Sequence, residues 1–340
     1  MQAVRINEYG GPEKLYVGEL PVPTPGPQDI LIKIAFSGIN FMDVYTRRGV
    51  YAGSSPYASE LPLTLGVEGS GWVESIGTEI KNFHPGDRVV FCLSRGSYAQ
   101  YALVPQAKVV ALPDDIELDL AAAGYFQGLT AHYLAYDTSK ITQGTICLIY
   151  SGSGGVANNL IQIAKHQKAV VIATCSTQAK CAAAKQLGAD HVCLSETGMI
   201  KVLVNEVTEG RGVDVLFDSV GAALFDTSLT LIKRKGLFVY YGANSDPIRA
   251  IDPMRLANSG SLYFVRPRLN DHILTRQELL DRSASLFLLW RNGIIKKSIN
   301  KVYELDGVAD AHALLEGRNS IGKSILSISK PGQSLEGNAS

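Results

Sequence analysis

The sequence has no excess of charge of either sign. Its 340 residues include 32 lysines and arginines against 32 aspartates and glutamates, which gives a formal net charge of zero and a pI near 7.0. A protein that mainly binds nucleic acid or an anionic membrane is expected to present a strong basic field. The charge balance supports neither activity. Charged residues make up only 19% of the chain and apolar residues 46%, so disorder over most of its length is not expected.

Features typical of metal sites and of hydrolases are also missing. No two of the five cysteines (Cys92, Cys147, Cys175, Cys181 and Cys193) lie two to four residues apart, and no histidine pair has ligand spacing. We therefore expect reduced, buried thiols in a cytoplasmic protein and no bound metal. The Gly-x-Ser-x-Gly pattern of a nucleophilic serine is absent from the sequence, which counts against a hydrolase.

No segment predicts insertion into a membrane or export. The longest uncharged segment, 141–164, contains glycines and several polar residues, so we expect a buried strand and turn there rather than a membrane helix. Residues 1–9 include Arg5 and Glu8 and are typical of a strand, not of a signal peptide.

The distribution of proline divides the chain into two parts. Half of the 14 prolines fall before residue 63, where runs such as 29–37 and 87–92 have strand-like patterns. Residues 1–124 are therefore expected to form an irregular, mostly β region. From about residue 118, apolar strands alternate with helical windows, which predicts a doubly wound parallel sheet. A chain of this length is expected to form two domains.

The most informative stretch is Thr145–Lys180. An apolar run at 146–150 precedes the segment SGSGG at 151–155, a helical window begins at Val156, and a second strand-like run covers 169–173. Strand, glycine turn, helix and strand form the layout of a dinucleotide-binding unit, in which backbone N–H groups and a helix N-terminus receive a pyrophosphate. A plain tight turn is the alternative interpretation of the glycines alone.

The second strand of this unit lacks the acidic residue that binds the ribose 2′-hydroxyl in NAD sites. No carboxylate occurs between Thr138 and Ala189. Lys180 follows Ser176 by four residues and is suited to hold a 2′-phosphate, which an acid would repel. An ordinary exposed helix lysine is the alternative for Lys180 alone. Together, the missing acid and the lysine favour NADPH over NADH.

Eight motifs distributed along the chain point to one family. They are GGPEKL (10–15), GINFMDVYTRRGVY (38–51), LGVEGSGWV (65–73), PGDRV (85–89), FQGLTAHYL (126–134), DSVG (218–221), GSLYFVRP (260–267) and GRNSIGKSIL (317–326). With them, the chain resembles the zinc-independent quinone oxidoreductases (zeta-crystallin-like) of the medium-chain dehydrogenase/reductase superfamily. The resemblance extends from residue 1 to about 328.

This resemblance implies an α/β protein with two domains. A GroES-like, mostly β catalytic domain would consist of residues 1–124 and 268–330. A Rossmann domain with a doubly wound parallel sheet would consist of residues 125–267, and residues 331–340 would form a disordered tail. The resemblance also implies a homodimer and an interdomain cleft that holds NADPH.

The resemblance further implies the site residues. Asn40 and Tyr45 are the expected catalytic residues, nearest the path of the hydride. Zinc-dependent relatives have a cysteine in place of Asn40 and Gly-His-Glu in place of Gly66-Val67-Glu68, so the metal ligands are missing here. The residues expected to bind the cofactor are Phe41, Asp43, Tyr133, Gly154, Gly155, Val156, Ser176, Lys180, Ser219, Gly242, Asn244, Ser245, Arg266 and Arg318. A surface ion pair is the alternative for each of the two arginines.

Three departures from the family pattern lie on the cofactor side. Ala157 replaces the last glycine of Gly-Gly-Val-Gly and adds a methyl group where helix and strand pack closely. Ser195 replaces a tyrosine that accompanies the lysine at the 2′-phosphate, and Gln127 stands where many relatives have lysine. These departures bear on the strength of NADPH binding rather than on the fold.

The function implied by the resemblance is NADPH-dependent transfer of a hydride from nicotinamide C4 to a quinone. A quinone oxygen can take its proton from solvent, and Asn40 or Tyr45 could polarise it by hydrogen bonding. Reduction of the carbon–carbon double bond of an enone or 2-alkenal is the first alternative. A nucleotide-bound crystallin-like or RNA-binding protein is an alternative of another class, against which the neutral charge counts.

Overall fold

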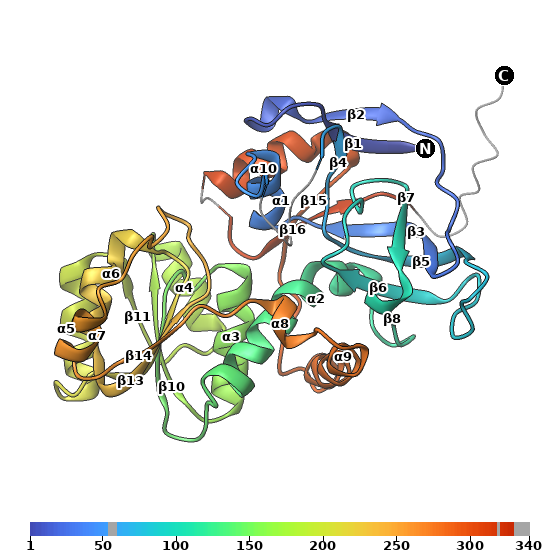
Figure 1. Cartoon of the computed structure of the whole chain (residues 1–340). Coiled ribbons are helices and arrows are strands. Elements are labelled where there is room, and N and C mark those ends of the chain that lie inside the picture. The colour runs from blue at the N-terminus through green and yellow to red at the C-terminus, as the bar shows by residue number, and fades with distance from the viewer. Residues whose placement is uncertain (54–59, 318–319, 330–340) are drawn as a thin grey trace. The chain divides into compact units, whose positions relative to one another are not determined.

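The computed structural model describes residues 1–53, 60–317 and 320–329. The chain divides into two compact units (Figure 1): unit 1 contains residues 1–126 and resumes at Lys297, and unit 2 contains residues 127–296. The expected tail at 331–340 lies outside the described residues. Among the helices of the described ranges, none is long and apolar enough to cross a membrane.

Unit 1 is mostly β, as its sequence predicts. A seven-stranded sheet has the strand order β15-β16-β3-β5-β6-β8, and β7 pairs with β3. Its strands are β3 (Asp29–Gly38), β5 (Glu68–Ile76), β6 (Arg88–Cys92), β7 (Tyr101–Pro105), β8 (Val109–Ala111), β15 (Ile299–Tyr303) and β16 (Lys323–Ser327). A smaller sheet of order β2-β1-β4 consists of β1 (Gln2–Ile6), β2 (Tyr16–Glu19) and β4 (Leu63–Thr64).

Both ends of the chain contribute to unit 1. Strand β16 pairs antiparallel with β3, and Ile325 lies opposite Gly38. Continuing this register places Lys323 level with Asn40, which directly precedes helix α1 (Phe41–Arg47). Helix α10 (Val308–Glu316) packs against α1. The C-terminal strand therefore brings a lysine to the start of a helix nearly 300 residues earlier in the chain.

Unit 2 contains a six-stranded sheet in which every strand pair is parallel, in the order β11-β10-β9-β12-β13-β14. Its strands are β9 (Ile146–Ile149), β10 (Val170–Cys175), β11 (His191–Leu194), β12 (Val213–Asp218), β13 (Ile232–Tyr240) and β14 (Tyr263–Val265). Its helices are α3 (Gly155–His166), α4 (Gln178–Gln186), α5 (Thr197–Thr208), α6 (Ala222–Leu229), α7 (Pro253–Asn258), α8 (Leu269–His272) and α9 (Arg276–Arg291). The doubly wound parallel sheet predicted from the sequence is confirmed.

The strand order changes direction at β9: β10 and β11 lie on one side of it, and β12, β13 and β14 lie on the other. Open parallel sheets bind ligands at such a point, outside the carboxyl ends of the strands. The glycine segment 151–155 follows β9, and Ser219 follows β12, its neighbour in the sheet. Two of the segments expected to bind a nucleotide therefore lie at the same edge of the sheet.

The sequence predicts the second domain boundary at residue 268. In the structure, unit 1 resumes only at Lys297. Helix α9 belongs to unit 2 because it packs on α2 (Leu118–Tyr133): a Cβ atom on Gly128 would lie 2.8 Å from Leu286 Cδ1. In the same helix pair, His132 Nε2 lies 2.8 Å from Ser285 Oγ. Both contacts depend on side chains that meet only in three dimensions, so the strand and helix pattern did not reveal them.

Candidate functional site

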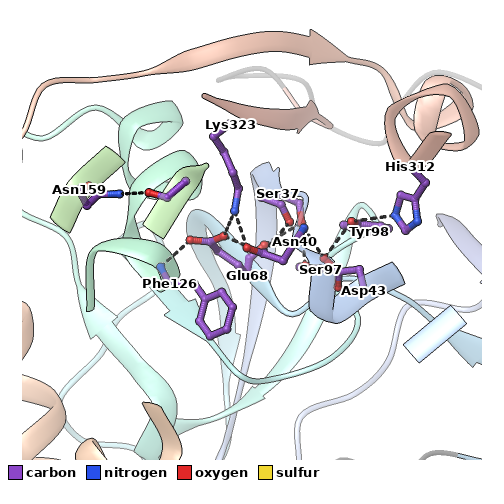
Figure 2. Close-up of polar contacts among 12 residues, drawn as sticks. Ser37, Asn40, Asp43, Glu68, Ser97, Tyr98, Phe126, Asn159, His312 and Lys323 are labelled. Atoms are coloured by element: carbon purple, nitrogen blue, oxygen red, sulfur yellow. Dashed lines mark hydrogen bonds and ion pairs between the residues drawn. The ribbon is translucent and has the colours of Figure 1, made fainter. Parts of the chain in front are cut away.

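A buried group of polar side chains surrounds the start of α1 (Figure 2). Lys323 Nζ lies 2.6 Å from Asn40 Oδ1 and 2.8 Å from Glu68 Oε2. Asn40 Nδ2 donates to the same Glu68 oxygen at 2.9 Å, and Glu68 Oε1 accepts from the Phe126 N–H at 2.6 Å. Asn40, Glu68 and Lys323 are all buried. The ammonium and the carboxylate compensate each other, which is what allows both charges to be buried.

The amide of Asn40 is fully engaged in this group. Besides its bond to Glu68, Nδ2 donates to the Gly38 carbonyl at 3.3 Å. An amide nitrogen has two N–H hydrogens, so neither is left for a bound molecule in this arrangement. Asn40 is therefore placed to hold the start of α1 rather than to donate a hydrogen bond to a ligand.

Asp43 fixes α1 from within its first turn. Its Oδ2 accepts from the backbone N–H of Asn40 at 2.8 Å and from the hydroxyl of Tyr98 at 3.1 Å. The first of these bonds belongs to a capping box, which satisfies backbone donors at a helix start. Burial, the largest effect, raises the pKa of Asp43 to about 7. The carboxyl therefore favours its protonated form more than an exposed aspartate does.

Arg47 sets the direction of a hydrogen-bond chain that ends at Asp43. Its guanidinium can only donate, so His312 Nδ1, at 3.2 Å from Arg47, is an acceptor. A neutral His312 then donates from Nε2 to the Tyr98 hydroxyl at 3.2 Å, and Tyr98 donates to Asp43. Burial and the charge of Arg47 lower the pKa of His312 to about 3, which keeps the ring neutral.

Aromatic side chains extend along and beyond α1. The ring of Tyr45 lies 6.0 Å from that of Phe41 and 6.1 Å, edge-on, from that of Tyr51. All three are only partly buried. Such rings give contact area to flat, conjugated molecules. Tyr45, unlike Asn40, belongs to a partly accessible group.

The glycine segment of unit 2 leads directly into α3. Gly154 is the residue before the helix and Gly155 and Val156 are its first two residues. A Cβ on Gly155 would lie 1.8 Å from Gln127 Oε1, and one on Gly152 would lie 2.9 Å from the Cβ of Ala173. Close approach therefore requires glycine at 152, whereas at 155 the atoms that a Cβ would meet belong to the end of the flexible Gln127 side chain. The methyl group of Ala157 is buried within α3, so the helix accommodates this departure.

The expected 2′-phosphate residues meet at the end of β10. Lys180 Nζ lies 3.2 Å from Ser176 Oγ, although the two residues are separated by the turn into α4. Ser195, at the position of the family tyrosine, donates to Thr174 Oγ1 at 3.3 Å. Lys180 is thus not a freely extended surface lysine, because its ammonium is turned back towards the strand end.

The loops after β12 and β13 are joined by backbone bonds. The Asn244 N–H donates to Ser219 O, and the Ser245 N–H donates to Val220 O, both at 2.8 Å. Gly242 donates to the Asp218 carbonyl at 3.3 Å. The four residues expected at the strand ends therefore form one connected edge. Burial raises the pKa of the Asp218 carboxyl to about 6.

Tyr133 and Arg266 each lie against an aromatic ring in unit 2. Tyr133 is stacked on His272, with centroids 4.1 Å apart and planes 9° apart. The guanidinium of Arg266 lies over the ring of Tyr240, 4.9 Å from its centroid. Arg318 lies outside the described residues.

Sequence reasoning missed Lys323 and the structural role of Glu68. Lys323 occurs in the motif GRNSIGKSIL, but only the pairing of β16 with β3 shows that its ammonium reaches Asn40. The hydrogen bonds that join His312, Tyr98 and Asp43 could not be predicted either, because these residues come from three separate parts of the sequence. A lysine at the start of a short strand-like run, KSILS at 323–327, was the one available signal.

The residues around Asn40 do not fit a bound zinc ion. Both oxygens of Glu68 accept hydrogen bonds, and Asn40 and Val67 are not ligands that zinc prefers. Among the described residues, no group of three or more His, Cys, Asp or Glu side chains could hold a metal.

Two family models match the chain. An alcohol dehydrogenase GroES-like domain matches residues 26–114, and a zinc-binding dehydrogenase domain matches residues 155–282. The first match falls within unit 1 and the second within unit 2.

Several named proteins are similar to this chain over nearly its full length. A 2-haloacrylate reductase from Burkholderia is 34% identical and the match covers 96% of this chain and 98% of the relative. Quinone oxidoreductase 1 from Escherichia coli is also 34% identical, with 95% and 98% covered. The crystal structure of the Escherichia coli quinone oxidoreductase complexed with NADPH superimposes with a TM-score of 0.91 over 96% of this chain and 100% of that one.

Proposed function

Because the chain belongs to the quinone oxidoreductase family of the medium-chain dehydrogenases/reductases, we propose that it is an NADPH-dependent quinone reductase. The observation that carries the proposal is the pair formed by Lys180 Nζ and Ser176 Oγ at the end of β10, in a segment without any carboxylate. A cation and a hydroxyl at this place suit a 2′-phosphate, whereas an acid would suit a 2′-hydroxyl.

The bound cofactor would supply the hydride from nicotinamide C4. In unit 2, Gly154, Gly155 and Val156 would receive the pyrophosphate on the N-terminus of α3. The connected edge of Ser219, Gly242, Asn244 and Ser245 would border the cofactor, together with Tyr133, Arg266 and Arg318. Phe41 and Asp43 would act in unit 1, Phe41 by contact and Asp43 by holding α1 in place.

For the acceptor, we assign different roles to the two expected catalytic residues. The hydroxyl of Tyr45 would polarise the acceptor oxygen, since that ring is only partly buried. Asn40 would act through α1, because its two N–H hydrogens are already used. Tyr45→Phe should lower kcat for a quinone at little cost in thermal stability, whereas Asn40→Ala should also lower the midpoint of thermal unfolding. An unchanged kcat in both variants would remove the assignment.

The reaction is proposed to need no zinc. Lys323 supplies the positive charge that neutralises Glu68, and in the part of the chain that the structure describes no group of three or more His, Cys, Asp or Glu side chains could hold a metal. The proposal also includes a cytoplasmic location, because all five cysteines are free thiols, as expected in a reducing compartment.

Reduction of a conjugated carbon–carbon double bond is a second candidate. It is favoured by the full-length similarity to the 2-haloacrylate reductase, whose name indicates such an acceptor. Steady-state rates with 1,4-benzoquinone and with a 2-alkenal, both with NADPH, distinguish the two. We expect the larger kcat/KM for benzoquinone. A larger value for the alkenal would replace the first candidate by the second.

The protein is proposed to act as a homodimer through the edge of the unit 2 sheet. Among the described residues, β14 pairs on one side only, with β13. Its first residue, Tyr263, is 63% exposed. An edge strand with a large exposed ring is a suitable place for a second copy to continue the sheet.

A further inference from the structure

The side chain of Gln127 lies over the first residue of α3. Gln127 is in α2, and it belongs to unit 2 together with Gly155. A Cβ on Gly155 would lie 1.8 Å from Gln127 Oε1, 2.2 Å from Cδ and 2.4 Å from Nε2. The terminal amide therefore fills the space that a side chain at position 155 would take. Among the described residues, a Cβ on Gly154 would have only Ser151 within 4 Å, so the amide covers the helix start rather than the turn before it.

The described residues of α3 give this helix start no side-chain cap. The residue before the helix, Gly154, has no side chain, and the first turn contains no acidic residue. The first N–H groups of an α-helix have no partner within the helix, and the helix dipole adds partial positive charge there. Asn159 Nδ2 donates to the Gly155 carbonyl at 2.7 Å, which holds the first turn in place (Figure 2). The Gln127 amide therefore lies at a fixed, electropositive helix end.

An amide at this place can turn to meet an anion. Its oxygen accepts hydrogen bonds, its NH2 group donates them, and a half-turn about the terminal bond exchanges the two. Oε1 is the atom nearest to Gly155, which suits a helix end that offers only donors. Within the described part of the chain, no hydrogen bond holds the Gln127 amide in this orientation, and the side chain is only partly buried. After the half-turn, Nε2 would take the place of Oε1 and present a donor.

We propose that Gln127 is a ligand of the cofactor's pyrophosphate, to which its amide donates beside the N-terminus of α3. This inference rests on the proposed NADPH-dependent activity and adds a binding residue to it. The pyrophosphate oxygens carry negative charge, and a hydrogen bond to a charged acceptor is stronger than one to a neutral acceptor. Gln127 therefore differs in its role from Lys180. NADPH and NADH share the pyrophosphate, so Gln127 contributes to the binding of both, whereas Lys180 contributes to NADPH alone.

The test measures the binding of NADPH, NADH and adenosine 2′-monophosphate by isothermal titration calorimetry, with no acceptor present. Adenosine 2′-monophosphate has the 2′-phosphate but no pyrophosphate. The variants are Gln127→Met, which keeps the length of the side chain without its amide, and Gln127→Lys, which adds a positive charge. Gln186→Lys, at the exposed end of α4, is the control for added charge. Thermal unfolding of each variant checks that it folds.

We expect Gln127→Met to raise Kd for NADPH and for NADH by a similar factor, about 5- to 50-fold, and Gln127→Lys to lower both. Kd for adenosine 2′-monophosphate in Gln127→Met, and all three constants in Gln186→Lys, should stay within about twofold of wild type. Equal losses for all three probes in Gln127→Met, or no loss for either dinucleotide, would overturn the role of Gln127. Equal Kd values of the wild-type protein for NADPH and NADH, without binding of adenosine 2′-monophosphate, would instead count against the proposed choice of NADPH.

Discussion

At the scale of single residues, cofactor choice depends on Lys180. Its ammonium points back to Ser176 Oγ at 3.2 Å, at the strand end where NAD-binding proteins place an acid. We expect Lys180→Met to raise KM for NADPH about 10- to 100-fold, a loss of about 1.4 to 2.8 kcal/mol, and to leave KM for NADH nearly unchanged. Initial rates with a saturating quinone and each cofactor measure both values.

Lys185 provides the matched control for this prediction. It lies in the same helix, α4, and donates to the Asp190 carbonyl at 2.5 Å rather than pointing towards Ser176. Lys185→Met should therefore change neither KM. A parallel increase of both KM values in Lys180→Met would show that Lys180 supports α4 and does not select NADPH.

The glycine turn also requires a residue without a side chain at one of its positions. A Cβ on Gly152 would lie 2.9 Å from the Cβ of Ala173, which cannot rotate away. We expect Gly152→Ala to displace the glycine turn from the end of β10 and to weaken NADPH binding at least tenfold, measured by the quenching of protein fluorescence. Gly198 has nothing within 4 Å of such a Cβ, so Gly198→Ala is the control and should bind normally.

At the scale of elements, helix α1 is held by a buried capping box that responds to pH. Burial raises the pKa of Asp43 to about 7 from its ordinary value of 3.8. The protonated carboxyl of Asp43 therefore stabilises the folded protein fully below about pH 4. This stabilisation is lost as the pH rises through about 7. Asp43→Asn keeps an oxygen acceptor but cannot ionise. The stability of this variant relative to wild type should increase between pH 5 and pH 8, as measured by urea unfolding.

A second capping box, in α9, supplies the comparison. Thr275 and Glu278 form it on an exposed surface, and bonds from the Thr275 backbone and hydroxyl lower the pKa of Glu278 below 4.5. The contribution of Glu278 is therefore present above about pH 4.5 and lost only in acid. Glu278→Gln should show no change in relative stability between pH 5 and pH 8. The same result for Asp43→Asn would contradict the account of α1.

Elements with a strong periodic pattern could be predicted from the sequence. The apolar run at 146–150 forms the strand Ile146–Ile149, and the helix expected from Val156 begins one residue earlier, at Gly155. Other boundaries shifted by more: the strand expected over 169–173 runs from Val170 to Cys175. Tertiary contacts decide such positions, as they do for the unit boundary set by α2 and α9.

Only part of the candidate site could be predicted from the sequence, for the same reason. The glycine turn and the Ser176–Lys180 spacing are local, and the structure brings these residues together as the spacing suggests. The Lys323–Glu68–Asn40 group joins residues up to 283 positions apart, and no local pattern reports such a contact. The motif singles out Asn40, but its hydrogen bonds, which the motif does not encode, direct it inward.

At the scale of the whole molecule, the proposed homodimer makes a prediction about β14. If a second copy extends the sheet there, a charge or a proline on this strand should prevent the pairing. We expect Phe264→Pro to yield monomers in analytical ultracentrifugation, and Tyr263→Lys to weaken the dimer with less effect on the core. Val302→Lys is the control and should leave the dimer intact, because the exposed Val302 lies on β15, an edge strand of the separate sheet in unit 1.

The central proposal is that this protein transfers a hydride from NADPH to a quinone without a metal. The most direct measurement is the initial rate of NADPH oxidation with 1,4-benzoquinone by protein that has been treated with a strong chelator. We predict a robust rate that equals the rate of untreated protein and exceeds the rate with NADH at the same low cofactor concentration. A rate that vanishes on chelation and returns with zinc, or equal rates with NADH and NADPH, would contradict the account.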